Sequence, residues 1–176
     1  MRIIAISGHA QNGKDTTANI IKKHLEEKGD KVLIVHYADL LKFICTKYFD
    51  WDGQKDEKGR NLLQYIGTDI IRKKAPTYWV DFVVGLLNIF GDCWDYVLIP
   101  DTRFPNEVSR LREAGFPVAH LRVSRGGGWV SPLSAEQQQH PSETALDKSK
   151  PDVFVKNNGT IEDLDAKLSK WIGEKL

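Results

Sequence analysis

The chain has 176 residues, of which 41% are apolar and 28% charged, and its 25 basic and 24 acidic residues leave a formal net charge of +1. This length predicts a single domain, 1–176, and the composition excludes a largely disordered or collagen-like chain. The near-neutral balance gives no basic field for a nucleic-acid polymer, and no apolar run approaches the roughly 18 residues of a membrane span. We therefore expect neither nucleic acid nor membrane as a partner.

Two cysteines, Cys45 and Cys93, are too few for a disulfide framework or a thiolate metal site. We interpret both as reduced core residues, which is typical of a reducing compartment. The first seven residues hold too short an apolar stretch for a secretory signal. The expected location is the cytoplasm.

The first elements alternate between strand and helix. Residues 3–6 form a continuous apolar run, which predicts a strand covered on both faces. Apolar residues at helical spacing follow and end at Gly29-Asp30, and residues 32–37 predict a second buried strand. Residues 39–90 then predict three helices, with Asp39 as the N-cap of the first and Pro76 as a break before the third.

The second half repeats the alternation. Strands are predicted at 97–99, 118–123 and 153–155, and helices at 105–115 and after Thr160. Between them lies a long polar stretch, 124–150, which contains three consecutive glycines and one short helix capped by Ser134 and Gln137. The alternation predicts an α/β fold with a five-stranded parallel sheet, whose ligand lies beyond the carboxyl ends of the strands.

A glycine-rich motif follows the first strand. Residues 8–14 read Gly-His-Ala-Gln-Asn-Gly-Lys, the G-x-x-x-x-G-K pattern of a phosphate-binding loop. The glycines let backbone N–H groups converge on phosphate oxygens at a helix N-terminus, and Lys14 adds a full positive charge. The motif lies between a buried strand and an amphipathic helix, which favours a true phosphate loop over a glycine turn with a surface lysine.

Two carboxylates are candidates for holding Mg²⁺. The residue after Lys14 is Asp15 where the general motif has Ser or Thr, so either Asp15 or Thr16 can take the metal. Asp101 follows the third strand and can hold the ion or its water shell. The alternatives are a helix N-terminal charge for Asp15 and a loop cap for Asp101.

Two arginines suggest a second anion site. Arg103 lies two residues beyond Asp101, and Arg72 lies in the helical segment. Each alone is an ordinary surface charge, but beside a phosphate loop the guanidinium fork suits a second phosphate.

Several blocks of sequence resemble the deoxynucleoside monophosphate kinases of the phage type. The resemblance rests on residues 7–18, 37–42, 63–72, 101–107, 140–143 and 157–160, in order over nearly the whole chain. Asp after the loop lysine is expected in that family. The resemblance implies a three-layer P-loop kinase fold with an acceptor-binding helical region at about 39–90 and a lid at about 124–150. It also implies transfer of the γ-phosphoryl group of ATP, with Mg²⁺, to a (deoxy)nucleoside monophosphate, and it leaves a homodimer open.

The candidate site residues fall into four groups. The catalytic candidates are Lys14, Asp101 and Arg103, and the metal candidates are Asp15, Thr16 and Asp101. The candidates for binding ATP are Gly8, Asn12, Gly13, Lys14, Asp15, Thr16, Arg122, Arg125 and Asn158. The candidates for binding the acceptor are Asp39, Lys42, Gln64, Asp69, Arg72, Arg103, His140 and Glu143.

Three other functions remain open on the sequence. One is a kinase of similar architecture that acts on another phosphorylated small molecule, such as dephospho-coenzyme A or phosphomevalonate. Another is a non-catalytic nucleotide-binding module, against which the chain shows no Asn-Lys-x-Asp guanine signature. The last is an inactive relative, which the intact Gly13, Lys14 and Arg103 disfavour.

Overall fold

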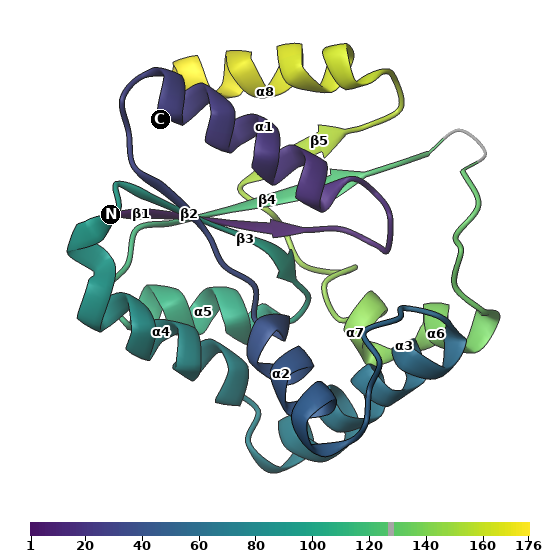
Figure 1. The fold of residues 1–176 in the computed structure, drawn as a ribbon. Helices are drawn as coiled ribbons and strands as arrows, with labels where there is room; N and C mark the ends of the chain where they lie inside the picture. Colours follow the sequence, from purple (N-terminus) through teal and green to yellow (C-terminus); the bar gives the residue numbers. More distant parts are fainter. Residues whose placement is uncertain (127–128) are drawn as a thin grey trace.

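The computed structural model describes residues 1–126 and 129–176 as three layers around one parallel sheet (Figure 1). The strand order is β2-β3-β1-β4-β5, and each neighbouring pair is parallel. The strands are β1 (Arg2–Ser7), β2 (Val32–Ile34), β3 (Tyr96–Thr102), β4 (Val118–Ser124) and β5 (Val153–Lys156). The predicted five-stranded parallel α/β architecture is confirmed.

Helices cover both faces of the sheet. Figure 1 shows α1 (Lys14–Glu27) and α8 (Ile161–Lys175) on one face, with α2 (Ala38–Tyr48), α4 (Tyr78–Phe90) and α5 (Pro105–Glu113) on the other. The helix α3 (Glu57–Gln64) continues as a π-helix, η1 (Tyr65–Arg72), and a 3₁₀ turn, η2 (Gly91–Cys93), follows α4. Two short helices, α6 (Ala135–Gln139) and α7 (Pro141–Thr144), lie in the segment between β4 and β5.

The hydrophobic core has two layers, one on each face of the sheet, because successive side chains of a strand point to opposite faces. In β1, Ile4 and Ile6 pack with residues of α1 and α8, whereas Ile3 packs with residues of α2 and α4 on the opposite face. All three side chains are fully buried. The continuous apolar run therefore marks a central strand, as the sequence predicted.

The region after β2 departs from the prediction in two ways. The strand ends at Ile34 rather than at residue 37, and α2 begins at Ala38, so Asp39 lies inside the helix and not at its N-cap. The reason is tertiary: the Asp101 carboxylate accepts hydrogen bonds from the backbone N–H groups of Tyr37 (3.1 Å) and Ala38 (2.9 Å). A carboxylate from β3 thus caps the helix that a local residue was predicted to cap.

The second predicted helix of the 39–90 region is divided. Its C-terminal half, Tyr65–Arg72, is a π-helix, and this half carries Gly67 against α2. A Cβ at Gly67 would lie 2.6 Å from the end of the Leu41 side chain, so the two helices approach closely here and a larger residue would displace Leu41. Residues at functional sites often lie on such π segments.

The cysteines are both free, as predicted, but only Cys45 is buried; Cys93 is exposed in η2 and does not belong to the core. Within residues 1–126 and 129–176, no helix combines the length and the apolar character needed to cross a membrane.

Candidate functional site

The loop between β1 and α1 adopts a conformation that only glycine permits at two points. Gly8 has φ +148° and a Cβ there would lie 2.3 Å from the carbonyl oxygen of Val123; Gly13 has φ +96° and its Cβ would lie 2.5 Å from the Asn157 side-chain nitrogen. Positive φ and close backbone approach are both characteristic of phosphate-cradling loops. The predicted loop at residues 8–14 therefore has the required backbone geometry.

The loop is held by an asparagine that follows the last strand. Asn157, buried after β5, donates from Nδ2 to the backbone oxygen of Asn12 at 3.0 Å. The Asn12 side chain is itself buried, and its Oδ1 has no hydrogen-bond partner among the described residues. The last strand thus supports the loop that follows the first strand.

Lys14 is folded over the loop. Its ammonium donates from Nζ to the backbone oxygens of Gly8 (2.8 Å) and His9 (2.9 Å), and its side chain is almost fully buried. Burial, with a smaller contribution from the nearby Arg103 charge, lowers the pKa of Lys14 to about 8. The ammonium therefore remains mainly protonated at neutral pH.

The metal candidates occupy different surroundings. Asp15 is exposed on the first turn of α1, 3.4 Å from His36 Nε2, and this contact lowers the pKa of Asp15 and raises that of His36. Thr16 lies on the same turn and is half-buried. Each carboxylate oxygen of Asp101 accepts one hydrogen bond from a backbone N–H group at the N-terminus of α2. Asp15 is thus the carboxylate most available to a ligand.

A cleft of about 450 Å³ separates the loop from the helical region. Its lining combines charged and polar side chains with apolar ones such as Leu41, Leu63 and Trp79, and it lies beyond the carboxyl ends of β1 and β3. Of the predicted site residues, Lys14, Asp15, Lys42, Gln64, Arg72, Asp101, Arg103 and Glu143 line it. The structure therefore brings together eight of the eighteen residues that the sequence singled out.

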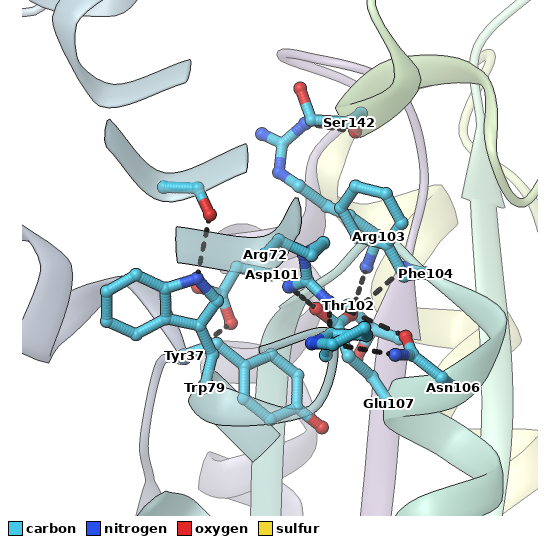
Figure 2. A network of polar contacts seen from close by, with 12 residues as sticks. Tyr37, Arg72, Trp79, Asp101, Thr102, Arg103, Phe104, Asn106, Glu107 and Ser142 are labelled. Carbon is cyan, nitrogen blue, oxygen red and sulfur yellow. Dashed lines mark hydrogen bonds and ion pairs between the residues drawn. The ribbon is translucent and has the colours of Figure 1, made fainter. Parts of the chain in front are cut away.

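Arg72 reaches the cleft from η1 and is held by the first turn of α5 (Figure 2). Its Nη2 donates to Glu107 Oε1 at 2.6 Å, its Nη1 donates to the Pro76 carbonyl at 3.1 Å, and its guanidinium lies 3.9 Å from the centroid of the Phe104 ring. The ring face and the carboxylate both favour a cation. The orientation of Arg72 is thus fixed before any ligand arrives.

Arg103 connects the cleft to the segment between β4 and β5. Its Nη1 contacts the Glu143 carboxylate and donates to the Ser142 carbonyl at 2.9 Å. The other oxygen of Glu143 accepts from the backbone N–H of Ala10, in the phosphate-binding loop, at 3.0 Å. Glu143 therefore joins the predicted lid to both the loop and Arg103.

The remaining predicted residues lie around the cleft rather than in it. Arg122 pairs with Asp147 (2.5 Å), Arg125 is exposed after β4, and Asn158 accepts from the Gly126 N–H at 2.8 Å. Asp39 pairs with Lys42, and Asp69 lies 3.7 Å from His140 Nε2. Of the three consecutive glycines in the predicted lid, where a hinge would be easiest to build, Gly127 and Gly128 lie outside the described residues.

Three residues of the site were not among the sequence candidates. They are Glu107, which is buried beside Arg72, Asn157, which supports the loop, and His36, which lies beside Asp15. Glu107 carried a signal, an acidic residue in the first turn of a helix that begins with Pro105, but this pattern is equally typical of an ordinary helix start. Asn157 and His36 follow strands at the carboxyl edge of the sheet, which is where ligand-binding residues gather.

Comparisons with known proteins identify the family of the chain. The family profile described as deoxynucleotide monophosphate kinase matches residues 37–168. The deoxynucleotide monophosphate kinase of Enterobacteria phage T4 is 32% identical over 115 residues, which are 64% of this chain and 44% of the phage protein. That of Escherichia phage RB69 is 30% identical over 113 residues, which are 63% of this chain and 43% of that protein. The chain thus aligns with less than half the length of either relative.

The fold has relatives among solved structures. A sugar kinase from Janibacter sp. HTCC2649 superposes with a TM-score of 0.59 over 98% of this chain and 95% of that chain, at 15% identity. At this identity the likeness shows the fold alone, and it confirms the predicted P-loop kinase fold. Because the family profile covers three quarters of the residues, the chain belongs to the deoxynucleotide monophosphate kinase family.

Proposed function

We propose that the chain transfers the γ-phosphoryl group of ATP to a (deoxy)nucleoside monophosphate, giving ADP and a (deoxy)nucleoside diphosphate. The observation that carries the proposal is the cleft, which is lined on one side by Lys14 of the phosphate-binding loop and on the other by Arg72 and Arg103. Two cationic groups facing a phosphate loop suit two phosphorylated substrates. Membership of the family supports the same reaction.

The chemistry requires little of the protein beyond position and charge. A monophosphate has a second pKa of about 6, so the acceptor oxygen is already anionic and needs no strong general base. Lys14, together with the N–H groups of the loop, neutralises charge on the donor, while Arg72 and Arg103 grip the acceptor phosphate. Arg103 reaches the acceptor by exchanging its contact with Glu143 for one with phosphate.

The donor nucleotide is assigned to the loop and the adjoining carboxyl ends of β4 and β5. Gly8, Asn12 and Gly13 shape the cradle, and the unpartnered Oδ1 of Asn12 fits a polar group that completes the site. Arg122, Arg125 and Asn158 lie at the ends of these two strands, where the adenosine of ATP would lie.

The donor set around Asp15 fits Mg²⁺. This ion is commonly held by one or two carboxylates, water and substrate phosphates, without a cage of protein ligands. Exposed Asp15 and the Thr16 hydroxyl on the same turn are the residues that would hold it, and Asp101 retains a free lone pair on each oxygen for a metal-bound water. When bound, the ion would neutralise charge on the transferring phosphoryl group.

The acceptor nucleoside is assigned to the helical side. Gln64 lines the cleft beside Leu63, Gly67 and Thr68 and can offer its amide to a base or sugar, while Lys42 is held beside the cleft by Asp39. Asp69 lies 3.7 Å from His140 Nε2, where the helical region approaches the lid, and both side chains are assigned to the acceptor side.

Residues 124–150 are proposed to act as a lid. The described part of this segment is docked on the site through Glu143 and through Gln137, which donates to Asn61 of α3 at 2.7 Å. Entry and release of nucleotides require these contacts to open, and closure would exclude water that otherwise hydrolyses ATP.

The test is a coupled assay of ADP release over all ribo- and deoxyribonucleoside monophosphates, with dephospho-coenzyme A and phosphomevalonate in the same panel. We expect turnover with at least one nucleoside monophosphate and none with the other two acceptors. Turnover only with one of those two would identify a different small-molecule kinase. ATP binding without transfer to any acceptor would identify a binding module or an inactive relative.

A further inference from the structure

Glu107 is a buried carboxylate with three hydrogen-bond donors around it. Its Oε1 accepts from Arg72 Nη2 at 2.6 Å, and its Oε2 accepts from the backbone N–H groups of Arg103 (2.7 Å) and Phe104 (3.0 Å) (Figure 2). Only about 2% of the side chain is exposed. One carboxylate therefore joins the side chain of one cleft arginine to the backbone of the other.

The two arginines come from distant parts of the chain. Arg72 ends the π-helix η1, whereas Arg103 lies in the turn between β3 and α5. Across this junction Asn106 donates from Nδ2 to the Pro76 carbonyl at 2.8 Å, and Arg72 Nη1 donates to the same oxygen. Glu107 is the charged centre of this junction.

The five N–H groups of Arg72 outnumber its hydrogen bonds to Pro76, Asn106 and Glu107. Its Nε is buried and has no hydrogen-bond partner among residues 1–126 and 129–176, although the residue lines the cleft. A guanidinium that is clamped through Nη1 and Nη2 and lines the cleft can offer a remaining N–H to an oxyanion without losing its orientation.

We propose that Glu107 is a positioning residue, which fixes the Arg72 guanidinium relative to the Arg103 turn so that both arginines meet the acceptor phosphate at a set separation. This inference rests on the proposed function, which assigns the acceptor phosphate to the two arginines. Glu107 does not touch substrate; it acts through Arg72, because a held side chain loses less conformational freedom when the phosphate binds.

The decisive variant is Glu107→Gln. The amide has nearly the same size, and its remaining oxygen can still accept from the Arg103 and Phe104 N–H groups, but its NH₂ group faces the Arg72 donor and breaks that bond. We expect the KM for the monophosphate to rise about tenfold or more, with the KM for ATP within about twofold of wild type. The matched control is Glu113→Gln on the same helix, whose exposed carboxylate lies 4.0 Å from Arg110 and should change neither constant.

A double variant separates positioning from a merely structural role. If Glu107 acts through Arg72, then Arg72→Met and Arg72→Met/Glu107→Gln should have the same KM for the monophosphate, because the second change has nothing left to orient. The double variant also removes both buried charges, which usually preserves folding. If Glu107→Gln alone does not fold, this comparison carries the test.

The outcomes are distinct from those of the proposed function. Wild-type turnover with a monophosphate is established first, and its absence would count against the function and not against Glu107. With an active wild type, equal increases in both KM values for Glu107→Gln would overturn the inference. A further tenfold loss in the double variant relative to Arg72→Met would overturn it as well.

Discussion

Gly13→Ala is expected to destabilise the protein and to disrupt its phosphate-binding loop. Gly13 has φ +96°, and an L-residue in the left-handed region costs roughly 1–2 kcal/mol. The new Cβ would lie 2.5 Å from Asn157 Nδ2, so the amide must shift and lose its bond to the Asn12 carbonyl, worth about 1 kcal/mol. The free energy of unfolding should therefore fall by about 2–3 kcal/mol, which lowers Tm by roughly 4–12 °C in a chain of this size.

The chain offers a matched control for the backbone cost. Gly29 has φ +95°, and a Cβ there meets nothing within 4 Å, so Gly29→Ala should lose only the roughly 1–2 kcal/mol of the left-handed conformation. Urea denaturation followed by circular dichroism gives both stabilities, and calorimetry gives the affinity for ATP. We expect ATP binding to be weaker than in the wild type for Gly13→Ala and unchanged for Gly29→Ala. Equal stability of the two variants, or wild-type ATP affinity in Gly13→Ala, would refute the reasoning.

Four further predictions concern the cleft. Lys14→Ala should fold but retain less than about a tenth of wild-type turnover in the ADP-release assay, because the variant lacks the positive charge that contacts the donor phosphates. A higher residual rate would contradict the assignment of Lys14 to the donor site. Since the pKa of Lys14 is lowered to about 8 in the free chain and a bound phosphate raises it, ATP binding should take up nearly one proton at about pH 9 and almost none at about pH 6.5; calorimetry in buffers of different ionisation enthalpy measures this uptake, and equal uptake at both pH values would contradict it. Arg103→Ala should reduce kcat/KM for the monophosphate roughly 10–150-fold through a lost charged hydrogen bond, and unchanged kinetics for both substrates would exclude the assignment. Glu143→Ala should speed hydrogen exchange across α6 and α7, because the bonds to Ala10 and Arg103 are lost, and unchanged exchange would show that other contacts hold the lid.

Much of the fold could be predicted because its signals are local. The apolar runs at β1 and β3 and the capping pair Ser134–Gln137 each depend on neighbouring residues, and the predicted capping box forms. The phosphate-binding loop is equally local, since its glycines, its lysine and its helix start lie within seven residues. Regular alternation of strand and helix then leaves few topologies other than a parallel sheet.

The departures from prediction all have tertiary causes. The sequence predicts Asp39 as the N-cap of α2. Instead Asp101, more than sixty residues away in sequence, accepts hydrogen bonds from the Tyr37 and Ala38 N–H groups at the start of this helix. The third helix predicted in the 39–90 region is α4, whose apolar residues differ in burial: Val83 and Leu87 are buried, whereas Phe82 and Phe90 are about half exposed. Periodicity shows that a helix has an apolar face but not how much of that face is covered.

The sequence by itself determined the phosphate-binding loop and which polar and charged residues follow each strand. These features follow from backbone propensity and from the direction that parallel strands share, which places the residues at the carboxyl edge of the sheet. Only the tertiary structure decided which charges meet. Glu107 and Arg72 are 35 positions apart in the sequence, a separation that does not by itself predict a contact. They meet because of how the π-helix η1 and α5 pack. Asn157 and Asn12 are 145 positions apart and meet because β4, which follows β1 in the sheet, places β5 within reach of the loop. Side-chain partners at such separations are set by packing, which no short stretch of sequence encodes.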